Sequence, residues 1–71
     1  MNNKLEKGKQ ILMEILEEAE YRLGGGRSEG QVWDYIYKAL PSPIKGRIKR
    51  MEFADNMYNI VAKRCGEPLI K

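Results

Sequence analysis

The sequence predicts a small all-α domain built from three helices. Three observations favour this class. Apolar residues recur at helical spacing along most of the chain, glycine and proline divide it into three segments, and no segment alternates apolar and polar residues over the length of a strand. A chain of 71 residues has room for one domain, residues 1–71. Its core must be small, since a domain of this size buries only about 60% of its unfolded surface.

The first helix is predicted over residues 3–23. Gly24, Gly25 and Gly26 end it, because glycine accepts the left-handed conformation common at helix C-termini. Gly8 weakens its first turns by about 1 kcal/mol relative to alanine. The apolar face consists of Leu5, Ile11, Leu12, Ile15, Leu16, Ala19 and Leu23.

The second helix is predicted over residues 29–40. Ser28 and Gln31 have the spacing of a capping box, in which the two residues satisfy each other's backbone N–H groups at a helix start. Pro41 cannot continue the helix. The expected core face consists of Val32, Trp33, Ile36, Tyr37 and Leu40.

The third helix is predicted over residues 43–65. Ser42 is a suitable N-cap and Pro43 suits the first helical position, while Gly66 and Pro68 supply the stop signals. The expected core stripe consists of Ile44, Ile48, Met51, Ala54, Tyr58, Val61, Ala62 and Cys65.

The third helix carries a second apolar stripe on nearly its opposite side, at Phe53, Met57 and Ile60. A helix that is apolar on two sides needs a neighbour on each. Either the other two helices pack on different sides of it, so that the stripe is core, or the stripe is an interface with a partner protein or a second copy of the chain. Small domains gain stability by dimerising, so a homodimer is one expectation.

Four cations stand at the predicted start of the third helix: Lys45, Arg47, Lys49 and Arg50. The helix dipole is positive there, which makes each cation locally unfavourable. Three interpretations remain open: pairing with acidic residues of the first helix or simple solvation, contact with an acidic protein surface, and contact with nucleic-acid phosphates. The second helix, the short connection and the third helix have the outline of a helix-turn-helix, but Gly46 and apolar residues interleave where base-reading side chains are usual.

Catalytic groups are scarce, and we expect no enzyme, no cofactor and no metal site. The chain has no histidine, which excludes a Ser-His-Asp triad and the commonest zinc ligand. Cys65 is the single cysteine, so neither an internal disulfide nor a cysteine-built metal site can form.

The net charge of +3 is unevenly distributed. Residues 1–30 hold five basic and six acidic side chains, whereas residues 31–71 hold eight basic and four acidic ones. The single cysteine and a polar start that does not resemble a secretory segment favour the cytoplasm. No uncharged stretch approaches the length that spans a bilayer.

The sequence therefore predicts a small basic, non-enzymatic protein that docks on another protein with an acidic or apolar groove and modulates or inhibits it. Such a role suits a viral or mobile-element product that blocks a host factor, and equally an ordinary adaptor. The alternative is a small DNA-binding regulator that uses the same helix end. The predicted partner-binding residues are Lys45, Arg47, Lys49, Arg50, Phe53, Met57 and Ile60.

Overall fold

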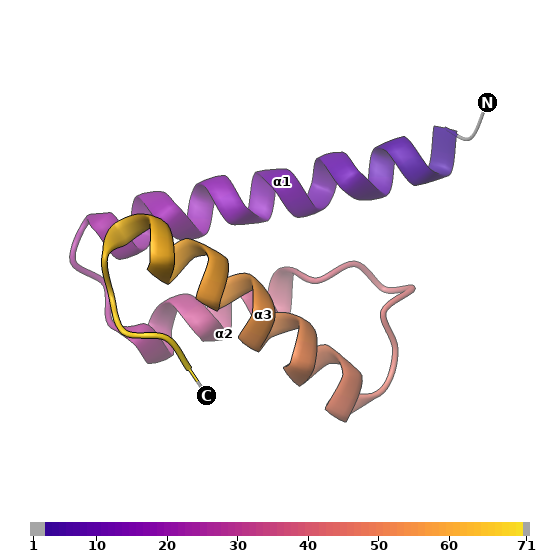
Figure 1. Cartoon of the computed structure of the whole chain (residues 1–71). Coiled ribbons are helices and arrows are strands. Elements are labelled where there is room, and N and C mark those ends of the chain that lie inside the picture. The colour runs from indigo at the N-terminus through magenta and orange to yellow at the C-terminus, as the bar shows by residue number, and fades with distance from the viewer. Residues whose placement is uncertain (1–2, 71) are drawn as a thin grey trace.

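The computed structural model describes residues 3–70, with side chains described from residue 7 onward. Three helices account for most of this range: α1 (Asn3–Gly24), α2 (Glu29–Ala39) and α3 (Arg47–Cys65) (Figure 1). The described range contains no strand. The predicted all-α, three-helix class is confirmed, and the first two helices have nearly the predicted bounds.

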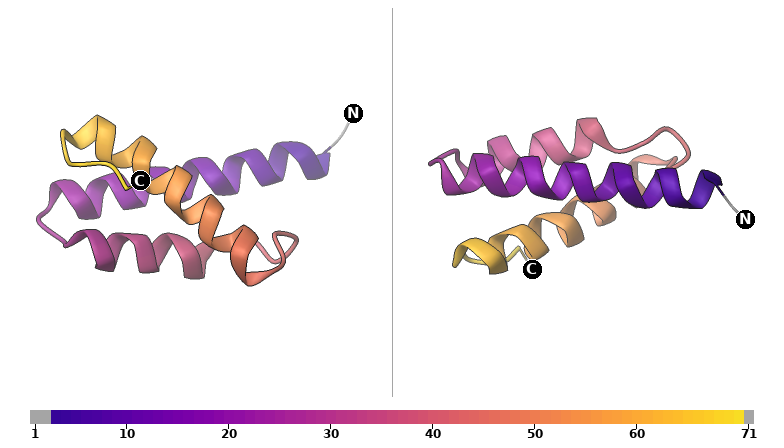
Figure 2. Two further views of the ribbon diagram at one scale, coloured as in Figure 1. Left: turned by 60° about the horizontal axis from the view of Figure 1, so that its bottom comes forward. Right: turned by 90° about the horizontal axis from the view of Figure 1, so that it is seen from above.

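The helices α1 and α2 lie side by side and run in opposite directions, and α3 crosses both of them (Figure 2). The molecule is elongated, with principal extents of 38 × 23 × 17 Å. The N-terminal turns of α1 extend past the end of the bundle (Figure 1). Those turns therefore lie outside the part of α1 that α2 and α3 cover.

The predicted capping box at the start of α2 is present. The Gln31 backbone N–H donates to Ser28 Oγ at 3.2 Å, and the Ser28 backbone N–H donates to Gln31 Oε1 at 3.1 Å. These two hydrogen bonds satisfy donors that a helix N-terminus otherwise leaves without partners.

The core lies where the three helices meet and contains no buried polar or charged residue within the described part of the chain. The fully buried residues of α1 all lie in its second half, and from the first half only Leu12, which is partly buried, packs against this core within the described side chains. The Leu5 side chain, predicted to lie on that face, falls outside the described residues. The core consists of Ile15, Ala19, Leu23, Val32, Ile36, Leu40, Ala54, Met57, Tyr58, Val61 and Ala62.

The predicted start of the third helix at residue 43 is wrong, because α3 begins at Arg47. Residues 41–44 instead form a turn, closed by a hydrogen bond of 3.1 Å from the Ile44 N–H to the Pro41 carbonyl. Gly46 is the N-cap, with φ of +89° and ψ of 129°. A positive φ of this kind suits glycine and breaks the helical path that Ser42 and Pro43 alone would start. Lys45 therefore lies in the connection and not in a helical turn.

Two residues of the predicted core stripe are on the surface: Ile48 is 75% exposed and Met51 is 40% exposed. Both precede Ala54, the first buried residue of α3. Met57, which was predicted as a partner contact, is only 6% exposed and belongs to the core. The buried sector of α3 is thus turned toward Met57, because α1 and α2 pack on different sides of the helix.

The C-terminal end of α3 follows its sequence signals. Gly66 adopts the left-handed conformation at φ of +73°. The chain then folds back along the helix, and Asn59 holds it there. The Asn59 Nδ2 group donates to the Ile70 carbonyl at 2.8 Å, and the Ile70 N–H donates to Asn59 Oδ1 at 2.7 Å.

Candidate docking surface

The cations Lys45, Arg47 and Lys49, called here the basic end of α3, are all exposed. None of them forms an ion pair with any side chain of residues 7–70. Lys45 lies in the connection, and Arg47 and Lys49 lie in the first turn of the helix. Their charge is added to the partial positive charge of the helix N-terminus, which leaves this end of the molecule attractive to anions.

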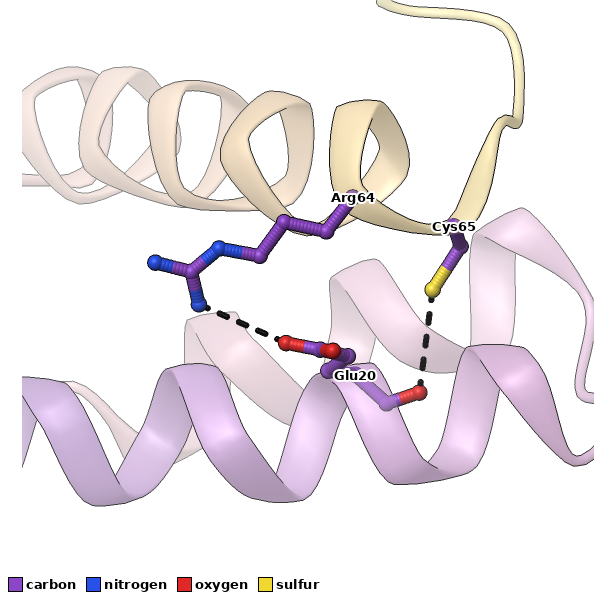
Figure 3. A network of polar contacts seen from close by, with 3 residues as sticks. All are labelled: Glu20, Arg64 and Cys65. Atoms are coloured by element: carbon purple, nitrogen blue, oxygen red, sulfur yellow. Dashed lines mark hydrogen bonds and ion pairs between the residues drawn. The ribbon is translucent and has the colours of Figure 1, made fainter.

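The acidic side chains of α1 described from residue 7 onward form no ion pair with these cations. Glu18 pairs with Arg22 on its own helix at 2.7 Å. Glu20 pairs with Arg64 at the other end of α3, at 3.4 Å (Figure 3). The Cys65 thiol donates to the Glu20 backbone carbonyl at 3.8 Å, which places this cysteine in a packed contact between the two helices (Figure 3). The described residues therefore do not show Glu18 or Glu20 neutralising the basic end.

Arg50, the fourth predicted cation, is occupied within the fold. Its guanidinium donates to four backbone carbonyls, at 2.8–3.3 Å, and its carbon lies 5.3 Å from the centre of the Tyr37 ring. The carbonyls belong to Tyr37, Leu40, Pro41 and Ile44. Helix C-termini leave carbonyls without intrahelical partners, and here one side chain binds that of Tyr37 in α2 together with three in the segment that follows the helix. Its predicted role as a docking residue is replaced by a structural one.

The exposed Ile48 and Met51 flank the cations of α3, and the sequence reasoning missed them because it assigned both to the core. The missed signal is the glycine at position 46, which delays the start of the helix. Of the predicted apolar contacts, Phe53 is half-buried, Ile60 is 44% exposed and Met57 is buried. Phe53 and Ile60 are therefore accessible to a partner, whereas Met57 is buried and is not.

An open groove of about 740 Å³ lies between the first half of α1, the connection before α3, and Phe53. Its walls are mainly apolar, and none of its described lining residues is acidic. The groove is lined by Lys7, Gly8, Lys9, Ile11, Leu12, Pro41, Ser42, Pro43, Ile44 and Phe53. Sequence reasoning expected such a groove on the partner, whereas the structure places one on this chain.

The tyrosines of α2 are packed against neighbours. Trp33 and Tyr37 stack with ring centroids 5.2 Å apart. The Arg22 guanidinium lies 4.2 Å from the centre of the Tyr35 ring. Burial, and to a smaller extent the charge of Glu18, raises the pKa of Tyr35. These aromatic side chains are engaged within the fold and do not form an open platform for stacking bases.

The described residues contain no group of three or more metal-ligating side chains. None of the helices in that part of the chain is both long enough and apolar enough to cross a membrane. The connection between α2 and α3 spans residues 40–46, which is longer than the three- or four-residue turn of a helix-turn-helix. The arrangement of α2 and α3 thus resembles a helix-turn-helix less closely than the sequence suggested.

No protein-family model matches the chain, and neither a curated protein nor a solved structure shows significant similarity to it.

Proposed function

We propose that this chain is a small non-enzymatic protein that docks on an acidic protein through the basic end of α3 and modulates or inhibits it. The observation that carries the proposal is the composition of residues 45–51, where the exposed cations of the basic end stand beside exposed Ile48 and Met51. None of these side chains belongs to the core.

Local physical chemistry supports a binding role for these residues. Cations at a helix N-terminus are unfavourable by a few tenths of a kcal/mol each, and an exposed isoleucine gains nothing from burial in the free chain. Sequences that break local rules without structural return commonly do so at functional sites. A mixed surface of cations and apolar side chains suits a protein interface, in which charge guides encounter and apolar contact supplies affinity.

Phe53 extends the surface along α3. Lys49 and Phe53 are four residues apart and hence share one side of the helix, which joins the cations to the apolar groove beside Phe53. Ile60 lies nearly two turns further along the helix and forms the far edge of the proposed surface.

The test is affinity capture from cell extract with the intact chain as bait, with and without nuclease. A second bait carries Lys45→Glu and Arg47→Glu. A third carries Arg27→Glu and Lys63→Glu, which changes the net charge equally at two exposed positions away from the basic end. We expect a protein that is retained after nuclease treatment by the wild-type and the third bait and lost by the second.

Three results contradict the proposal. A protein that all three baits retain equally does not bind through the basic end. Loss of every partner on nuclease treatment transfers the basic end to the DNA-binding alternative. If the wild-type bait retains no protein, the proposed docking role is wrong for the proteins of that extract.

A further inference from the structure

We infer that the groove between α1 and α3 receives an acidic amphipathic helix of the partner protein, seated against Gly8 and Phe53. This inference rests on the proposed docking function and specifies its partner. The groove is distinct from the exposed cations of the basic end, although it adjoins them through Lys49 and Phe53.

The first argument is the continuity of the apolar face of α1. Ile15, Ala19 and Leu23 on this face are buried by the other helices. One and two turns earlier the same face presents Leu12, which is partly buried, and then Gly8, and both line the open groove. Since helices cover the second half of the stripe, another helix laid into the groove would continue the same packing over the first half.

The second argument is Gly8. Glycine within a helix lowers its stability relative to alanine, so its presence needs a reason. No atom of the chain approaches within 4 Å of the position where a Cβ would stand, so the fold itself does not require a glycine there. A glycine facing a groove allows another backbone to approach closely.

The third argument is charge. The lining residues include two cations, Lys7 and Lys9, and no described acid. Lys45 directly follows Ile44 of the groove wall, and Lys49 stands one turn before Phe53. An occupant with glutamate or aspartate along its flanks would meet cations on both sides of the groove.

A second copy of this chain fits the groove less well. The acidic part of α1 has its apolar face buried in its own core at Ile15 and Ala19, so it has no such face to offer. The first half of α1 has a partly uncovered apolar face, but Lys7 and Lys9 flank it. Its insertion into the groove of another copy would place cations beside cations.

The test uses synthetic peptides of about 18 residues, a length at which helices become appreciable in water. The first has leucine at helical spacing with glutamate and alanine at the other positions. The second replaces each glutamate by lysine. The third has the composition of the first in an order that abolishes the apolar stripe. Binding is measured by titration of the ¹⁵N-labelled intact chain, with amide shifts mapped onto the structure.

We expect saturable binding of the first peptide, with amide shifts concentrated at residues 7–12, at Ser42 and Ile44, and at Phe53. Gly8→Leu fills the groove and weakens this binding by about tenfold or more. It also removes a helix-weakening glycine, so unfolding cannot explain the loss. Gly30→Leu is the matched control, because Gly30 is likewise in a helix with open space at its Cβ position, but lies on α2. It leaves binding unchanged.

The charge requirement is tested by Lys7→Glu with Lys9→Glu, which weakens binding of the glutamate peptide by about tenfold. The pair Arg27→Glu and Lys63→Glu, with the same change in net charge, has a smaller effect. Equal binding of the lysine peptide or of the reordered peptide overturns the inference. So does binding that survives Gly8→Leu, or a concentration-dependent dimer of the chain that Gly8→Leu abolishes.

The outcomes separate this inference from the proposed function. If the basic end retains a protein partner but the glutamate peptide does not bind, docking through Lys45 and Arg47 stands and the groove inference is wrong. If neither the partner nor the peptide binds, both are wrong.

Discussion

The indole Nε1 of Trp33 donates a hydrogen bond to Oδ1 of Asp55 at 2.7 Å. This bond joins the middle of α2 to the middle of α3 and gives the partly buried polar atom of the only tryptophan a charged acceptor. Buried tryptophan usually needs such a partner for its N–H, and a hydrogen bond to an ionised group is stronger than one between neutral groups. Together with the hydrogen bond from Arg50 to the Tyr37 carbonyl, it fixes how α2 packs against α3.

Asp55→Ala is expected to lower the free energy of unfolding by about 1.5–3 kcal/mol, because it removes the acceptor and leaves the indole N–H without a partner. Denaturant unfolding followed by circular dichroism measures the loss, and the emission of Trp33 reports the change in its surroundings. Asp55→Asn retains an acceptor oxygen and should lose less. Equal losses for the two variants would show that the carboxylate acts through its charge alone.

Arg50→Ala is expected to lower the free energy of unfolding by about 2–3 kcal/mol, since it removes the shared donor of four backbone carbonyls, of which only that of Pro41 keeps another partner among the described residues, the Ile44 N–H. Arg50→Lys should restore little, because an ammonium group lacks the planar fork that reaches several carbonyls at once. Arg47→Ala, at an exposed cation of the basic end, is the control and should be nearly neutral. A neutral result for Arg50→Ala would mean that water satisfies these carbonyls equally well.

Replacement of two glycines by alanine should change the free energy of unfolding in opposite directions. Gly46→Ala is expected to lower the free energy of unfolding by about 1–2 kcal/mol, because its φ of +89° is unfavourable for a residue with a Cβ. No atom lies within 4 Å of either added Cβ, so the difference isolates backbone conformation from steric contact. Gly30→Ala, in α2, is expected to raise stability by about 0.5–1 kcal/mol. Thermal unfolding of the two variants checks the prediction, and equal signs would contradict it.

Tyr58 makes stability depend on pH at the alkaline end. Burial, and to a lesser extent Glu29, raises the pKa of Tyr58 above its ordinary value of 10.0. The folded chain then holds the phenol proton more tightly than the unfolded chain does. The resulting stabilisation is complete below about pH 10 and is lost as the pH rises through the raised pKa.

The measurement is denaturant unfolding at a series of pH values from about 8 to about 11, a range that spans ordinary tyrosine ionisation. Tyr58→Phe should lose less stability over this range than the wild type, while Tyr21→Phe, at an exposed ring, should follow the wild type. Part of the loss should persist in Tyr58→Phe, because Tyr35 also has a raised pKa. Identical curves for the wild type and Tyr58→Phe would contradict the assignment.

The parts of the fold that the sequence predicted are those set by neighbouring residues. The capping box of Ser28 and Gln31 spans four residues, and the left-handed Gly66 follows directly from the end of the apolar pattern. Such signals work through hydrogen bonds between residues close in the chain, and tertiary structure did not need to be known to interpret them.

The start of α3 was mispredicted because a tertiary interaction overrides a local signal there. Ser42 and Pro43 favour a helix start, but the carbonyls of residues 40, 41 and 44 accept hydrogen bonds from Arg50, a residue further along the chain. Periodicity alone could not show which segment of a helix its neighbours cover. For that reason Ile48 and Met51 were assigned to the core and Met57 was left open between core and interface.

The candidate surface was predicted in part. Lys45, Arg47, Lys49 and Phe53 follow from composition and helical spacing, and the structure brings these residues together near one end of α3. The groove was not predictable, because it depends on the path of residues 41–44 relative to α1. That path is set by the positive φ of Gly46 and by the hydrogen bonds of Arg50.

Positions 45–50 hold two kinds of residue. Gly46 and Arg50 are required by the backbone, whereas Lys45, Arg47 and Lys49 contribute nothing to the core. Under the proposed docking role, selection for folding and selection for partner binding would act on different positions within this single hexapeptide. As homologous chains diverge, the glycine and the arginine should persist in every lineage that keeps this fold. The same role predicts that the three cations vary with the acidic surface of the partner, so that a new target could be acquired without a new scaffold.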